Sequence, residues 1–196
     1  MRTLTIFAAA LAMAIPAAAS AQFSDSYNFL KAVRDRDVNK ANDLATKPGS
    51  VIVDTRDIST GESALHIVTR ARDLPWLNFI LQKKAKPDIR DNSGNTPLMV
   101  AAQIGFIEGV QSLLRARANI NQANSAGETP LIRAVQNRDA AMVRLLLANG
   151  ANPDKADTSA GLSARDYAAR DRRAAPILKL IEDSKTPSAK PVAGPK

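Results

Sequence analysis

The chain carries the phrase GNTPLMVA at Gly94–Ala101 and repeats it as GETPLIRA at Gly127–Ala134. An earlier copy, GESALHIV, stands at Gly61–Val68, and a weaker one, GLSARDYA, stands at Gly161–Ala168. The first three copies are evenly spaced, and the last begins one position later than that spacing predicts. Self-similarity at one period indicates an array of stacked repeats rather than a single globular core.

Each phrase contains the signals that begin a helix. The hydroxyl of Thr96 suits a helix N-cap, and Pro97 suits the first helical position because it has no amide hydrogen to satisfy. Leu98 and the alanines after it point to one face, and Gly105 permits a left-handed turn. A second helix follows, with Leu113 and its neighbours on its apolar face. One such unit cannot bury its own apolar face, so we expect the units to fold by stacking.

A period of about 33 residues with a Thr-Pro-Leu-His-x-Ala phrase resembles the ankyrin repeat. The resemblance is clear over Ile58–Asp183, and a divergent unit with helical spacing of apolar residues precedes it at Ser26–Asp57. It implies an all-α solenoid of about five helix–turn–helix units with short β-hairpin-type loops. We place the units at residues 26–57, 58–90, 91–123, 124–157 and 158–183, within an ankyrin-repeat domain over 22–183.

Some positions depart from the repeat pattern. Arg72 and Arg138 stand where the inter-helix glycine belongs, and Lys84 and Arg117 stand where a glycine follows the second helix. A non-glycine residue in the left-handed conformation costs roughly 1 kcal/mol. We therefore expect these units to be less stable than idealised repeats. An extra residue among Asp157–Ala160 predicts a longer last hairpin.

Both ends of the chain differ from the repeats. A positive start, an apolar run at Leu4–Ile15 and the small-x-small pattern at Ala19–Ala21 predict a signal peptide over residues 1–21. We therefore expect a bacterial protein that is periplasmic or secreted after cleavage near Ala21. No later apolar run is long enough for a transmembrane segment. Ser184–Lys196 is rich in Pro, Ala and Lys, and we expect a disordered basic tail there.

Composition excludes several classes of site. The 196 residues include no cysteine and one histidine, and the net charge is +8. Disulfide frameworks, thiolate zinc sites, iron–sulfur clusters, cysteine nucleophiles and multi-histidine metal sites are therefore excluded. The basic excess suits an acidic protein partner or anionic envelope material, or it serves solubility alone. We expect no cofactor, no metal and no nucleic-acid partner.

Catalytic constellations are nearly absent. His66 is the only candidate base for a serine hydrolase, and the ankyrin resemblance implies that it is structural and bonds between adjacent units. Glu62 and Glu128 stand two units apart, too far for the paired carboxylates of a glycosidase. Trp76 is expected to pack in the core. The remaining acids of note are expected to accept hydrogen bonds at turns; they are Asp88, Asp91, Asp154 and Asp157.

The resemblance implies a binding surface on the hairpin tips and on the concave face of the inner helices. The tip positions are Ser59, Thr60, Glu62, Asn92, Ser93, Asn95, Ser125, Ala126 and Glu128. The concave positions are Arg70, Ala71, Gln103, Ile104, Gln136, Asn137, Arg170 and Asp171. Together with Arg133, the arginines would give this face a basic character.

The function that follows from these features is a non-enzymatic, monomeric module that binds a protein partner. Two alternatives remain open. The chain could be held to anionic polymers or lipids of the envelope by its basic face and tail, or it could be a secreted effector.

Overall fold

A computed structural model describes residues 17–47 and 52–184. Within these ranges the chain forms ten α-helices, two short 3₁₀ helices and no strand beyond one isolated bridge between Arg56 and Ser63. The predicted signal peptide and tail lie outside the described residues, except that Ala17–Ala21 begins the first helix and Ser184 ends the described part.

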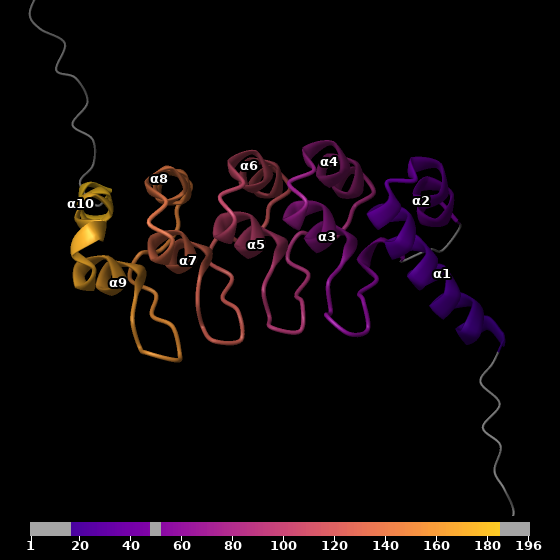
Figure 1. The fold of residues 1–196 in the computed structure, drawn as a ribbon, viewed down its shortest axis with the longest axis horizontal. Coiled ribbons are helices and arrows are strands. Elements are labelled where there is room, and N and C mark those ends of the chain that lie inside the picture. Colours follow the sequence, from indigo (N-terminus) through magenta and orange to yellow (C-terminus); the bar gives the residue numbers. More distant parts are fainter. Residues whose placement is uncertain (1–16, 48–51, 185–196) are drawn as a thin grey trace, which may run out of the picture.

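The helices follow one another as five pairs in two layers, with hairpin loops that project from the inner layer (Figure 1). The inner helices are α1 (Ala17–Asp35), α3 (Ala64–Arg70), α5 (Pro97–Gln103), α7 (Pro130–Gln136) and α9 (Ala164–Arg170). The outer helices are α2 (Val38–Ala45), α4 (Leu74–Gln82), α6 (Ile107–Arg115), α8 (Ala140–Ala148) and α10 (Ala175–Asp183). The 3₁₀ helices are η1 (Ile52–Asp54) and η2 (Arg172–Ala174). The predicted all-α solenoid is confirmed, and its divergent first unit is a helix pair.

The inner helices begin where the repeated phrase predicts. The hydroxyls of Thr96 and Thr129 accept hydrogen bonds from the backbone N–H groups of Met99 and Ile132, each at 3.3 Å. A proline follows each cap at the start of α5 and α7, where the missing amide hydrogen leaves no acceptor unsatisfied. These local signals fix the start of each helix independently of its neighbours.

Left-handed residues separate the helices, as the sequence predicts. Gly105 has a φ of 66°, and Gly150 has a φ of 86°. The predicted non-glycine residues adopt the same conformation, with φ of 53° at Arg72, 64° at Lys84, 65° at Arg117 and 56° at Arg138. Arg36, in the first unit, is also left-handed at 59°, a position that was not predicted from the sequence.

Two of these left-handed arginines link adjacent units by ion pairs, and Arg72 does so by donating to the carbonyl of Ile104. Arg36 pairs with Asp73 at 2.7 Å, and Arg138 pairs with Asp171 at 2.6 Å. Each aspartate stands at the helix start of the next unit, where it also accepts a backbone N–H. The ion pair offsets part of the backbone strain at the arginine, since a half-exposed pair contributes about 0.2–1 kcal/mol. In the third unit Gly105 stands at the arginine position, and no such pair forms there.

The hairpins differ in length by one residue. Asp157 donates its backbone N–H to the carbonyl of Leu162, whereas Asn124 donates to the carbonyl of Glu128. The longer last hairpin is therefore confirmed. The first hairpin has the same extra residue, because Asp57 donates to the carbonyl of Glu62.

The core is a continuous aliphatic layer between the units. Leu98 and Leu131 are fully buried at equivalent positions of successive inner helices. Trp76 is 8% exposed and meets Phe79 edge to face with ring centroids 5.3 Å apart, so its predicted packing role is confirmed. None of the helices in the described part of the chain combines the length and apolar character that crossing a bilayer requires.

A pair of glycine substitutions separates backbone strain from crowding between units. A Cβ at Gly127 would clash with the backbone nitrogen of Thr158 in the next hairpin, whereas a Cβ at Gly150 meets no atom within 4 Å. Both residues have positive φ. We expect Gly150→Ala to lower the free energy of unfolding by about 1 kcal/mol, and Gly127→Ala to lower it by a further 1–3 kcal/mol, roughly the cost of overpacking. Urea unfolding followed by circular dichroism measures both; equal losses would contradict the contact between hairpins.

Candidate binding surface

The hairpin tips form a row joined by backbone hydrogen bonds. The N–H of Asn92 donates to the carbonyl of Thr60 at 3.1 Å, and the N–H of Ser125 donates to the carbonyl of Ser93 at 3.1 Å. The same bond joins Thr158 to the carbonyl of Ala126 at 2.9 Å. These bonds hold the tips in position through the main chain. The side chains of Ser59 and Asn92 add bonds to Asp57 and to the carbonyl of Ser59, and they are exposed.

Acidic side chains stabilise the turns from within, as predicted for Asp91 and Asp157. Asp91 accepts the backbone N–H groups of Ser93 and Asn95 at 2.9 and 2.8 Å. Asp57 acts similarly: hydrogen bonds from Ser59 and the guanidinium of Arg34 hold its pKa far below the usual range.

Two further acids have different partners. Asp88 accepts the backbone N–H of Asn119 in the next unit at 2.8 Å, so it links units. Asp154 pairs with Arg165 at 2.8 Å. All four acids are therefore structural, but only Asp91 and Asp157 act mainly within turns; Asp88 and Asp154 bind groups of the next unit.

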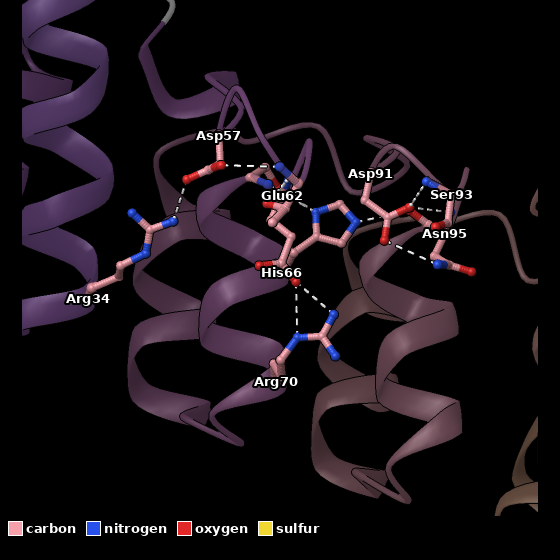
Figure 2. Close-up of polar contacts among 10 residues, drawn as sticks. Arg34, Asp57, Glu62, His66, Arg70, Asp91, Ser93 and Asn95 are labelled. Atoms are coloured by element: carbon pink, nitrogen blue, oxygen red, sulfur yellow. Dashed lines mark hydrogen bonds and ion pairs between the residues drawn. The ribbon is translucent and has the colours of Figure 1, made fainter.

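His66 is fully buried and joins two units (Figure 2). Its Nδ1 accepts the backbone N–H of Ser63 at 3.2 Å, which places the proton on Nε2, and Nε2 donates to the carbonyl of Asn95 at 2.9 Å. Burial lowers the pKa of His66, and this outweighs the opposing effects of Asn95, Asp91 and Glu62. Both ring nitrogens are engaged, so the structural role is confirmed and no nitrogen is left for general-base chemistry.

Arg70 and Arg133, which the sequence places on the concave face, form ion pairs within their own units. Arg70 donates to Glu62 at 2.6 and 3.0 Å (Figure 2), and Arg133 pairs with Glu128 at 2.8 Å. The glutamates are mostly buried, with side chains 18% and 14% exposed. These pairs neutralise much of the basic character that the sequence predicts for this face.

A family model described as ankyrin repeats (3 copies) matches the chain at residues 18–124, 65–157 and 98–189. The overlapping matches together extend over most of the chain. The chain belongs to the ankyrin-repeat family. Ankyrin repeats are protein–protein interaction modules and typically act as non-enzymatic scaffolds.

The predicted ankyrin surface divides into two groups of residues. The exposed members are Ser59, Thr60, Arg70, Asn92, Ser93, Gln103, Ser125, Asn137 and Arg170. The half-buried members are Glu62, Asn95, Ile104, Glu128 and Gln136. Among the described residues, no group of three or more His, Asp or Glu side chains is arranged to hold a metal ion.

The half-buried polar members are bonded within the ankyrin array. Asn95 accepts the side-chain amide of Asn124 at 3.2 Å, which bridges two units. Gln136 hydrogen-bonds Tyr167, whose hydroxyl donates to Asp157 at 2.6 Å and whose pKa that aspartate raises. The sequence did not predict a polar role for Tyr167. It occupies the same repeat position as Arg133, one unit later, and this equivalence could have identified it.

We expect stability to depend on pH through His66, the one histidine of the chain. The folded state depresses the pKa of His66, so the unfolded chain binds the proton more tightly and stability falls as pH drops through about 6.5. Unfolding by urea at pH 7.5 and pH 5.5 should give a lower free energy at the acid value. Asp57, Asp157, Asp166 and Asp171 have lowered pKa values, so they titrate below pH 5.5 and do not contribute to this difference.

The variant His66→Gln is the control for this measurement. The variant should be less stable at pH 7.5, because the glutamine does not reproduce both hydrogen bonds of His66, from the N–H of Ser63 and to the carbonyl of Asn95. Its free energy of unfolding should change little between the two pH values. The same pH dependence in the variant and in the unsubstituted chain would show that another group is responsible.

Proposed function

We propose that this ankyrin array is a non-enzymatic module that binds a protein partner along the exposed hairpin tips and the concave face, in the bacterial periplasm. The observation that carries the proposal is the row of tips joined main chain to main chain, which leaves Ser59, Asn92, Ser93 and Ser125 exposed. A surface fixed before binding loses less conformational entropy when the partner arrives.

The chemistry of this surface suits a polar protein interface. Gln103 and Asn137 are exposed at the end of successive inner helices, and the amide of Asn137 donates to the carbonyl of Gln103 at 2.6 Å. Ile104 follows Gln103 directly and is half-buried. Amides offer both donors and acceptors to a partner, while the half-buried isoleucine adds apolar area that a partner would cover.

The periplasmic location is supported by the sequence at positions 1–21 and by the absence of cysteine. Cleavage after Ala21 would remove Ala17–Ala21 from α1 and leave the buried residues Phe29 and Leu30 in place. The first unit would therefore keep its packing after export.

Export gives a direct prediction for the N-terminus. Mass spectrometry of the protein from a periplasmic fraction should find a mature chain that begins at Gln22. A chain recovered only from the cytosol with Met1 at its start would contradict this location.

Partner binding is tested by crosslinking in cells, followed by recovery of the complex at low salt and at about 1 M salt, where the screening length falls to about 3 Å. The test variant is Ser93→Tyr with Gln103→Tyr, since both side chains are exposed and form no side-chain hydrogen bond in the described part of the chain. The matched control is Gln111→Tyr with Ala141→Tyr, which adds nearly the same bulk, also without a change of charge, to exposed positions of the outer helices α6 and α8.

A protein recovered at both salt concentrations with the unsubstituted chain and the control, but at least about tenfold less (1.4 kcal/mol) with the test variant, supports the proposal. Equal recovery with both variants would place the binding surface elsewhere. If material is recovered only at low salt, and equally with the unsubstituted chain and both variants, attachment to anionic envelope polymers or lipids would be favoured.

A further inference from the structure

The inner helices and inter-helix turns form one edge of the solenoid, on which most of the basic residues are arginines; Lys31 of α1 pairs with Asp35. Over the first two units these arginines are compensated. Arg34 pairs with Asp57 at 2.8 Å, Arg36 pairs with Asp73, and Arg70 pairs with Glu62. Arg72 donates to the carbonyl of Ile104 in the next unit. Three of these four arginines therefore have an acidic partner, and Arg72 has a carbonyl partner instead.

The C-terminal part of the same edge differs. Arg170, Arg172 and Arg173 lie close together at the end of α9 and in η2, and Arg138 reaches them from the unit before. We refer to these four residues as the arginine patch. Asp171 is the acid among them, and it pairs with both Arg138 at 2.6 Å and Arg173 at 3.6 Å.

Two members of the arginine patch have no ion pair in the described part of the chain. Arg170 and Arg172 are both exposed. Arg170 lies one helical turn from Asp166, but that carboxylate already accepts the hydroxyl and the backbone N–H of Ser163 at 2.5 and 2.9 Å. The side chain of Arg173 is 77% exposed despite its contact with Asp171. The patch thus presents more guanidinium donors than the chain itself satisfies.

Asp171 shows that a carboxylate binds within the arginine patch. Its Oδ2 receives Nε–H of Arg138 at 2.6 Å, and its Oδ1 receives the backbone N–H of Arg173 at 3.0 Å. These two bonds hold the pKa of Asp171 below the usual range, so the carboxylate stays charged. A guanidinium fork matches a carboxylate in two-point geometry, whereas a lysine ammonium is a point charge. The patch contains no lysine.

The position of apolar side chains favours a protein over a membrane as the partner. Interfacial membrane binding combines basic residues with inserted apolar ones. The exposed large hydrophobic residues of the described chain are Tyr27, Val38 and Ile58. All three belong to the first unit and the first hairpin, at the end of the solenoid away from the arginine patch (Figure 1). Arg170 is also one of the concave positions, so the patch is continuous with the proposed binding surface.

We propose that the arginine patch binds an acidic segment of the protein partner, with Asp or Glu carboxylates seated between the guanidinium groups of Arg170, Arg172 and Arg173. The inference rests on the proposed function, and it places the charged part of the interface at the C-terminal end of the array. The partner segment has more than one carboxylate, because Arg170 and Arg172 have no ion pair in the described part of the chain and Arg173 meets Asp171 only at 3.6 Å.

The test measures binding of a fluorescent oligoglutamate peptide to the purified chain by anisotropy, with an oligoglutamine peptide of equal length as the neutral probe. The patch variant is Arg170→Ala with Arg172→Ala and Arg173→Ala, which leaves the pair between Arg138 and Asp171 in place. The control is Arg117→Ala with Arg144→Ala and Lys179→Ala, which removes the same charge from other exposed positions. Circular dichroism verifies folding; if the patch variant does not fold, the three arginines are changed to lysine instead.

We expect the patch variant to bind oligoglutamate at least about tenfold more weakly, and the control to stay within about twofold of the unsubstituted chain. The lysine variant should also bind more weakly, since its charge is kept and only the fork is lost. Equal losses in the patch variant and the control would show that net charge alone attracts the peptide, which overturns the inference. Binding to vesicles of anionic lipid that is lost in the patch variant, with oligoglutamate binding unchanged, would also overturn it in favour of a lipid surface.

The same variants separate this inference from the proposed function. Suppose that a periplasmic partner crosslinks equally to the patch variant and to the unsubstituted chain, but not to the Ser93 and Gln103 variant. The role of the arginine patch would then be overturned, and the proposed function as a binding module would stand. Patch-dependent oligoglutamate binding supports the patch even where that crosslinking experiment fails, in which case the proposed concave surface is wrong.

Discussion

A single helix pair in this chain cannot bury its own apolar face, and the rest of the structure depends on the stacking that this imposes. Leu98 and Leu131 are fully buried because each is covered by residues of the neighbouring units. The spacing between the units is then set by close contacts rather than by long side chains. At Gly127 even a single Cβ would clash with the next hairpin, and this closeness lets the backbone bonds form from tip to tip.

Stacking also determines what the polar residues can do. A polar group buried at the interface between units is destabilising by about 1–3 kcal/mol if it finds no partner there. His66, Asn95 and Asp88 meet this requirement by bonding to the next unit. Their side chains are consequently committed to the array. The residues left for a partner are those beyond the interface, at the tips and along the edges, which is why the proposed surface consists mainly of exposed hydroxyl, amide and guanidinium groups.

At Arg36 and Arg138, one residue both adopts the left-handed turn between two helices and forms an ion pair with the next unit. Glycine would relieve the strain at Arg36 or Arg138, but it could not reach the aspartate of the next unit. In the third unit Gly105 takes this position, where it adopts the left-handed conformation without strain but has no side chain to form an ion pair. As a result the edge of the solenoid changes along its length, from mostly paired arginines in the first two units, through Gly105 in the third, to the arginine patch at the C-terminal end, where one aspartate faces four arginines.

The sequence by itself determined the period, the helix starts at Thr96 and Thr129, the left-handed turns and the structural role of His66. These features depend on contacts within one unit or on a register that recurs from each unit to the next, and both can be read along the chain. Only the tertiary structure decided that Glu62 and Glu128 bind Arg70 and Arg133, that Asp88 acts between units, and that Arg36 is left-handed. The physical reason is that a long charged side chain can reach any of several neighbours, and the folded geometry decides which one it meets. Arg70 meets a glutamate eight residues before it, Arg133 meets one five residues before it, and Asp88 meets a group of the next unit, so these contacts share no common spacing in the sequence.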